Sequence, residues 1–65
     1  MNKIEIYTGN FCGFCTAAKR LLNKKGAIFS EINIHDNVEK RAGMMQRSNG
    51  GRTVPQVFIK DIHVG

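Results

Sequence analysis

The order of a strand, a helix and a second strand in the first half of the chain constrains its fold most strongly. Residues 3–7 alternate with period two and are rich in branched and aromatic side chains, which predicts a strand. Helical spacing of apolar residues follows from Cys12 to Lys25, and Gly26 provides the C-terminal stop. Residues 28–34 then predict a second strand. A β-α-β unit of this kind requires a parallel strand pair with a right-handed crossover.

A second helix is predicted after this unit. Asp36 and Glu39 have the spacing of a capping box, so the helix should begin near Asn37, and the glycine-rich residues 49–51 should end it. The expected apolar stripes are Phe14, Ala17, Ala18, Leu21 and Leu22 on the first helix and Val38, Ala42 and Met45 on the second.

The remaining residues predict an antiparallel hairpin. Residues 53–59 favour a strand with Pro55 confined to its start, and a short turn leads to a fourth strand over residues 62–64. The complete order is β-α-β-α-β-β, an α/β fold with a four-stranded mixed sheet in one domain, residues 1–65. Such a sheet needs helices on both of its faces, and the two predicted helices can cover one face each.

The chain stops at Gly65, just as the fourth strand ends. The face that carries the first helix should need a second helix to shield four apolar side chains, Val57, Ile59, Ile62 and Val64. We therefore expect the native polypeptide to continue into a C-terminal helix that is absent from these 65 residues.

Charge and composition exclude several classes of function. The net charge is +5, but the basic residues are spread along the chain, Arg47 and Arg52 among them, and no zinc-finger spacing or aromatic nucleic-acid motif accompanies them. We expect no nucleic-acid partner. No apolar run approaches the length of a membrane helix, and the N-terminus lacks a signal-peptide core. A cytoplasmic, monomeric protein without membrane contact is expected.

The strongest chemical signal is the motif Cys12-Gly13-Phe14-Cys15 at the start of the first predicted helix. A helix N-terminus presents unpaired N–H groups and about half a positive charge, which stabilise a thiolate. The spacing puts Cys15 one turn below Cys12, close enough for a disulfide. Cys12, nearer the helix end and the solvent, should be the nucleophile, and the more buried Cys15 should be the resolving thiol.

Two other interpretations of the cysteine pair compete. In the first, the two cysteines are two ligands of a zinc site that His35 and His63 complete, although the histidines lack the usual ligand spacing. The thiols could also be inert and buried, but the exposed position beside Gly13 argues against that. A CxxC motif near a β-α-β pattern in an intracellular protein is typical of a thioredoxin-like redox site.

Four segments together resemble a bacterial dithiol glutaredoxin: residues 4–8, residues 12–15, residues 19–22 and residues 52–59. The resemblance covers the whole chain and implies a thioredoxin-like fold. It also implies a glutathione-dependent thiol–disulfide oxidoreductase, with glutathione as co-substrate and with protein disulfides and glutathione mixed disulfides as substrates. Whether glutathione or thioredoxin reductase supplies the electrons stays open.

The resemblance also implies a glutathione site around a Thr-Val-Pro segment. In the family this segment holds a cis proline that faces the active cysteine. Carried over, Val54 offers main-chain hydrogen bonds to glutathione, Pro55 is the cis residue, and Thr53 lies beside the glutathione tail. Phe14, between the two cysteines, is the fourth expected glutathione contact.

Departures from the family pattern leave a second function open. The usual motif is Cys-Pro-Tyr-Cys, and a lysine often found shortly before it is missing here. Gly13-Phe14 instead copies the middle of the Cys-Gly-Phe-Ser motif of monothiol glutaredoxins, which hold a [2Fe–2S] cluster between two subunits with glutathione as co-ligand. In that alternative Cys12 would be a cluster ligand. Cys15 argues against it, because the monothiol motif has serine there.

Overall fold

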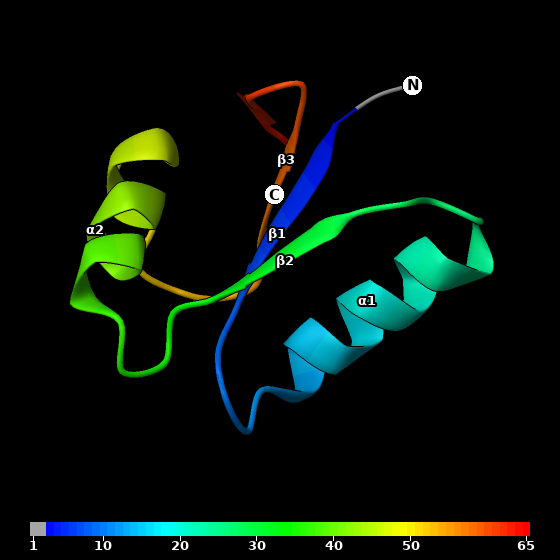
Figure 1. Ribbon diagram of the computed structural model, residues 1–65, viewed down its shortest axis with the longest axis horizontal. Coiled ribbons are helices and arrows are strands. Elements are labelled where there is room, and N and C mark those ends of the chain that lie inside the picture. Colours follow the sequence, from blue (N-terminus) through cyan, green and yellow to red (C-terminus); the bar gives the residue numbers. More distant parts are fainter. Residues whose placement is uncertain (1–2) are drawn as a thin grey trace.

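The computed structural model describes residues 3–65 and has the predicted order of elements. In chain order these are β1 (Ile4–Thr8), α1 (Gly13–Lys24), β2 (Ser30–Asn33), α2 (Val38–Arg47), β3 (Gln56–Ile59) and β4 (Ile62–His63). The sheet order is β2-β1-β3-β4, with β1 parallel to β2 and the other two pairs antiparallel. Figure 1 shows α1 and α2 on opposite sides of this sheet. The expected mixed sheet with one helix on each face is confirmed.

The alternation of side chains along β1 divides the core between the two faces of the sheet. Tyr7 packs with Phe58 and with Met44 of α2, and these three buried side chains form the main hydrophobic cluster. Ile6 and Thr8 point to the other face, where α1 lies, and both are fully buried. The site described below lies on this second face.

The second helix begins where expected but with a different cap. Asn37, not Asp36, is the N-cap, and its side-chain oxygen accepts the Lys40 N–H at 3.0 Å. Asp36 has a φ of 58°, so it belongs to the left-handed turn before the helix. Met44 is the buried residue of α2, whereas Val38 is 83 % exposed, because the C-terminal half of the helix is the part that reaches Tyr7 and Phe58.

The first helix is also less buried than its apolar pattern predicts. Cys15 is its buried residue, whereas Phe14 and Leu21 are 80 % and 54 % exposed.

Strands β2 and β3 begin later than predicted, at Ser30 and Gln56. Ile62 and Val64 are exposed over more than half of their surfaces. The expected C-terminal helix lies after Gly65 and stays a prediction.

Arg47, at the end of α2, ties this helix to the sheet. Its guanidinium donates to the Tyr7 hydroxyl and to the Glu5 carboxylate, both at 2.9 Å, and to Asp61 at 3.2 Å. It also stacks 4.2 Å above the Phe58 ring. The hydrogen bond to Glu5 is the main reason that the pKa of Arg47 is raised. The sequence pattern treats Arg47 as one of several dispersed cations, but the structure makes it part of the α2 packing.

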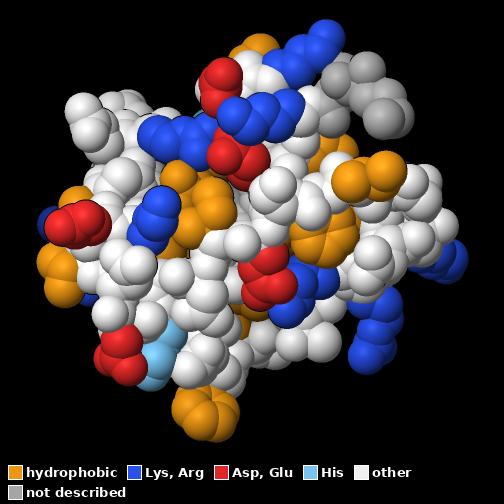
Figure 2. Space-filling view, in the orientation of Figure 1, with side chains coloured by type: hydrophobic (Ala, Val, Ile, Leu, Met, Phe, Trp, Pro, Cys, Tyr) orange, Lys and Arg blue, Asp and Glu red, His pale blue; other side chains and the backbone are white. Residues whose placement is uncertain are grey.

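The surface carries mixed charge. On the face shown in Figure 2, Lys and Arg side chains are interleaved with Asp and Glu rather than forming a continuous basic stripe. Among residues 3–65, no helix has the length and apolar character needed to cross a membrane.

Candidate active site

Cys12 occupies the N-cap position of α1 with its sulfur in the place of a capping oxygen. Its backbone is extended, with φ −108° and ψ 103°, and its Sγ accepts the backbone N–H of Cys15 at 3.1 Å. No acidic side chain lies in the first turn of the helix, so nothing there opposes a negative charge on the sulfur. Cys12 is partly exposed. A thiolate at this position is therefore stabilised by a backbone donor and by the helix dipole while solvent still reaches it.

Cys15 lies beneath Cys12 and is 2 % exposed. Burial is the main reason that the pKa of the Cys15 thiol is raised, and the hydrogen bond and charge of Cys12 raise it further. The Gly9 backbone and the Lys19 ammonium act in the opposite direction. Both cysteines are free thiols in the structure. The two thiols therefore lie in different environments, with Cys15 buried and Cys12 capped and partly exposed.

The loop before β3 faces the exposed cysteine. The Val54–Pro55 peptide bond is cis, as the resemblance implies, and the Val54 carbonyl oxygen lies 3.9 Å from Cys12 Sγ. Gly9 permits this approach, since a Cβ added there would lie only 3.3 Å from a Val54 methyl. Val54 and Pro55 are half-buried, and the Thr53 side chain is exposed. Sequence positions far apart in the chain therefore meet at Cys12.

Two aromatic side chains near Cys12 in the sequence, Phe11 and Phe14, lie at the surface. Phe14 is 80 % exposed and Phe11 is completely exposed, with a φ of 56° that side chains of its size rarely adopt. Phe14 is thus accessible to a ligand from solvent, and its contact with glutathione stays a prediction.

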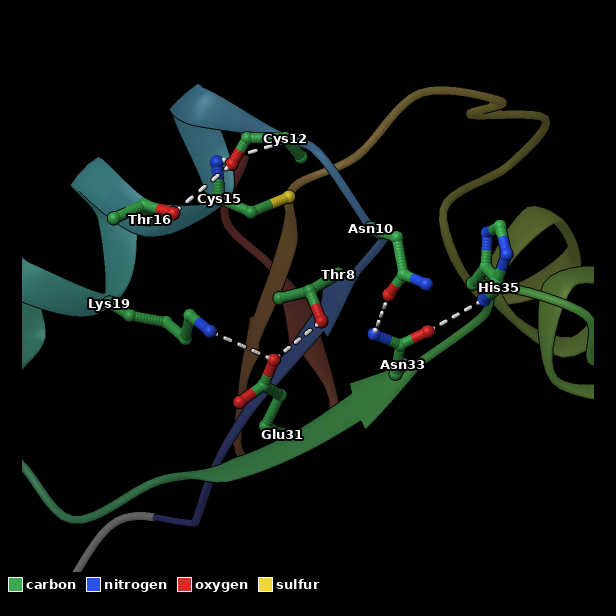
Figure 3. A network of polar contacts seen from close by, with 9 residues as sticks. All are labelled: Thr8, Asn10, Cys12, Cys15, Thr16, Lys19, Glu31, Asn33 and His35. Carbon is green, nitrogen blue, oxygen red and sulfur yellow. Dashed lines mark hydrogen bonds and ion pairs between the residues drawn. The ribbon is translucent and has the colours of Figure 1, made fainter.

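A hollow of about 450 Å³ opens beside the two cysteines, and the polar side chains that line it include Asn10, Lys19, Glu31 and Asn33. The Glu31 carboxylate accepts the Thr8 hydroxyl at 2.7 Å and the Lys19 ammonium at 3.0 Å (Figure 3). Asn33 donates to the Asn10 side chain at 3.1 Å. The hydrogen bond from Thr8 is the main reason that the pKa of Glu31 is lowered, and the hydrogen bond from Lys19 lowers it further. The hollow therefore contains a fixed carboxylate and a fixed ammonium next to the thiols.

Thr8, Lys19 and Glu31 are not among the site residues predicted from the sequence, although signals for them exist. Lys19 follows Cys15 by four residues, so the two share one face of α1. Ile6 of β1 is in register with Glu31 of β2, which puts Glu31 on the same sheet face as Ile6 and Thr8. Finding these contacts from sequence requires the strand register, which the residue pattern alone does not determine.

The zinc interpretation receives no support from the described part of the chain. Within residues 3–65, there is no group of three or more His, Cys, Asp or Glu side chains that could hold a metal ion. His35 pairs with Asp36 at 3.3 Å, and His63 contacts Gln56 and the Phe58 ring. Neither histidine joins the cysteine pair.

Comparison with known proteins agrees with this arrangement. The glutaredoxin family model matches residues 4–64. A probable glutaredoxin of Synechocystis is 49 % identical over 63 residues, which cover 97 % of this chain and 72 % of that protein. Glutaredoxin 1 from Francisella tularensis has a TM-score of 0.83 at 31 % identity, covering 100 % of this chain and 83 % of that one. The buckwheat glutaredoxin–glutathione complex has a TM-score of 0.81 at 32 % identity, covering 98 % and 60 %.

These matches span both cysteines and the cis-proline loop. The solved glutaredoxins share the four-stranded sheet flanked by helices, which confirms the thioredoxin-like fold. The pair of thiols at the start of α1 supplies the chemistry of thiol–disulfide exchange. The chain therefore belongs to the glutaredoxin family and is a glutaredoxin-type thiol oxidoreductase.

Proposed function

We propose that the protein is a glutathione-dependent thiol–disulfide oxidoreductase in which Cys12 is the nucleophile and Cys15 the resolving thiol. The capped sulfur supports this assignment most directly: Cys12 Sγ accepts the Cys15 N–H at 3.1 Å and is open to solvent. Cys15 is buried and its pKa is raised, mainly by burial. Only the thiolate attacks a disulfide, so the two environments favour opposite roles.

The first proposed route removes glutathione from a protein. The Cys12 thiolate attacks the glutathione sulfur of a protein–glutathione disulfide, a Cys12–glutathione disulfide forms, and the protein thiolate leaves and takes a proton from water. A second glutathione thiolate then attacks the glutathione sulfur on Cys12. This step releases glutathione disulfide and regenerates the Cys12 thiolate. Across the two steps, one free glutathione is oxidised as one protein thiol is released, and the glutathione removed from the substrate becomes the other half of glutathione disulfide.

The second proposed route reduces a protein disulfide and needs both cysteines. Cys12 attacks one sulfur of the substrate, and a mixed disulfide forms as the other substrate sulfur leaves. Cys15 loses its proton and attacks Cys12 Sγ, which forms the Cys12–Cys15 disulfide and releases the second substrate thiolate. The substrate gains two electrons and two protons, and the cysteine pair is oxidised. Two glutathione molecules then reduce the pair in two exchange steps and leave as glutathione disulfide.

Glutathione is proposed to bind along the cis-proline loop. Val54 offers its main chain to the cysteinyl part of glutathione, Pro55 orients that main chain, and Thr53 and Phe14 lie beside the tripeptide. The proximity of the Val54 carbonyl to Cys12 Sγ and the buckwheat glutaredoxin–glutathione complex support this placement.

A coupled assay tests the proposed function. Reduction of a glutathione mixed disulfide is followed as NADPH consumption in the presence of glutathione and glutathione reductase. We expect a rate that rises with glutathione concentration and disappears after Cys12 is alkylated. A rate independent of glutathione, or supported only by thioredoxin reductase, would contradict the proposal.

The competing function, a carrier of [2Fe–2S], makes a separate prediction at Gly13. Because residues 3–65 bring together no three metal-ligating side chains, a cluster at Cys12 would need ligands from outside this chain. Gly13 is the first helical residue, a position that tolerates proline, and a Cβ added there meets nothing within 4 Å. Gly13→Pro should therefore fold and keep disulfide reduction within about twofold of wild type, since it alters no sulfur.

Anaerobic reconstitution with iron and sulfide distinguishes the two functions. The oxidoreductase proposal expects wild-type protein to stay colourless. Brown wild-type protein whose visible absorbance is lost in Gly13→Pro would instead support the carrier function, with the proline ring occupying the space beside Cys12.

A further inference from the structure

The polar network beside the two cysteines has no role in either proposed route. Its parts come from three elements: Thr8 from β1, Lys19 from α1 and Glu31 from β2. Thr8 is fully buried, while the Lys19 and Glu31 side chains are about one third exposed. Figure 3 shows that Cys15 and Lys19, on successive turns of α1, both point toward β1. The network therefore fixes a cation on the side of the helix that carries the buried thiol.

Glu31 itself is a poor candidate for the base that deprotonates Cys15. Its two partners, Thr8 and Lys19, lower its pKa below the ordinary carboxyl value, so it binds a proton only weakly at neutral pH. Its carboxylate instead accepts two hydrogen bonds at 2.7 and 3.0 Å, and these bonds determine where the Lys19 ammonium lies. Glu31 therefore holds the Lys19 ammonium in place and does not transfer a proton.

We propose that Lys19, held by Glu31 and Thr8, is a positioning residue that stabilises the thiolate of Cys15 when Cys15 attacks a mixed disulfide on Cys12. The proposal rests on the two-cysteine route proposed above. In the resting protein the Cys12 sulfur accepts the Cys15 N–H, and burial keeps Cys15 protonated. When Cys12 is bound in a mixed disulfide it carries no negative charge, so the repulsion between the two sulfurs disappears. The ammonium of Lys19 then stabilises the Cys15 thiolate without the opposing charge of Cys12.

The groups that line the hollow permit this role. Besides the two cysteines, its titratable side chains are Lys19 and Glu31, and its other polar side chains, Asn10, Thr16 and Asn33, are uncharged. The direct effect of Lys19 on Cys15 is to lower the pKa of that thiol, against the larger effect of burial. Glu31 opposes a thiolate, but its charge is paired with Lys19 at 3.0 Å. The step itself stays balanced, with the Cys15 proton going to water and the released thiolate taking one from water.

The test measures the titration of Cys15 in protein that contains Cys12→Ser, so that the ultraviolet absorbance of a thiolate reports one sulfur. In this background Lys19→Met should raise the midpoint pH by about 0.5 to 1, the effect of losing a nearby, partly screened cation. Lys19→Arg should restore the midpoint. Lys24→Met, which removes an exposed cation from the last turn of the same helix, is the matched control and should leave the midpoint unchanged.

A kinetic ratio measures the consequence in protein with both cysteines. Lys19→Met should lower the rate of protein-disulfide reduction relative to deglutathionylation by about two- to fourfold near pH 7, because fewer Cys15 thiolates form but each is more nucleophilic. Equal midpoints for Lys19→Met and Lys24→Met, or a failure of Lys19→Arg to restore the midpoint, would overturn the proposal. The titration needs no activity, so it decides the role of Lys19 even if the glutathione-dependent function fails its own assay.

Discussion

Replacing Cys12 by serine should reduce both deglutathionylation and protein-disulfide reduction by roughly a thousandfold or more, because a serine hydroxyl does not ionise to a useful nucleophile at this site. Replacing Cys15 by serine should affect the two reactions unequally. Deglutathionylation needs only Cys12 and free glutathione and should persist, whereas protein-disulfide reduction should stall at the mixed disulfide. Steady-state rates on one glutathionylated peptide and one peptide disulfide measure the difference.

Both variants should fold, so that a difference in rate reports the loss of a sulfur and not the loss of the structure. Serine is an effective N-cap residue, so Cys12→Ser keeps an acceptor for the Cys15 N–H. Cys15→Ser puts a hydroxyl into a buried position and should cost about 1 to 3 kcal/mol if that hydroxyl finds no partner. Circular dichroism at the assay temperature is the control. If the two folded variants were equally inactive on the glutathionylated peptide, the assignment of nucleophile and resolving thiol would be wrong.

Arg47→Met should destabilise the fold by about 1 to 3 kcal/mol, a large share of the roughly 3–5 kcal/mol that a core of this size supplies. The substitution keeps the apolar stem over Phe58 but removes the donors to Glu5, Tyr7 and Asp61. Glu5 is the main source of the cost, because its side chain is 14 % exposed and would keep a charge without its partner. Urea denaturation measures the change in the free energy of unfolding.

Arg41→Met is the matched control for this prediction. Arg41 is exposed on the same helix and makes none of the Arg47 contacts, so its replacement should change the free energy of unfolding by less than about 0.5 kcal/mol. Equal stability of the two variants would mean that Arg47 is only a surface cation, as its sequence context implies.

The fold follows from the sequence because its signals are local and agree with one another. The alternation in β1, the helical spacing after Cys12 and the stop at Gly26 each involve neighbouring residues, and Gly26 has the positive φ of 71° that such a stop requires. The position of Cys12 at the helix N-terminus follows from the same local pattern. This is why the reactive pair could be predicted before any contact was known.

The errors arise where a residue's role depends on distant partners. Both Asp36 and Asn37 are good caps by type, and the left-handed turn at Asp36 decides between them. Val38 and Met44 are both apolar, but only Met44 reaches the cluster around Tyr7 and Phe58. The same holds for charged residues, since strand register and helix placement determine the partners of Lys19 and Arg47.

The central claim is that the sulfur capping α1 reacts first, and trapping the first covalent intermediate tests it most directly. Fully reduced protein is mixed with glutathione disulfide at less than one equivalent, quenched within milliseconds by acid, alkylated and analysed by tandem mass spectrometry. Cys15→Ser protein, in which the intermediate cannot be resolved, is treated in parallel. The account predicts glutathione on Cys12 in both samples, with Cys15 alkylated wherever wild-type protein has not yet formed the internal disulfide. Glutathione found on Cys15 while Cys12 is alkylated would contradict it.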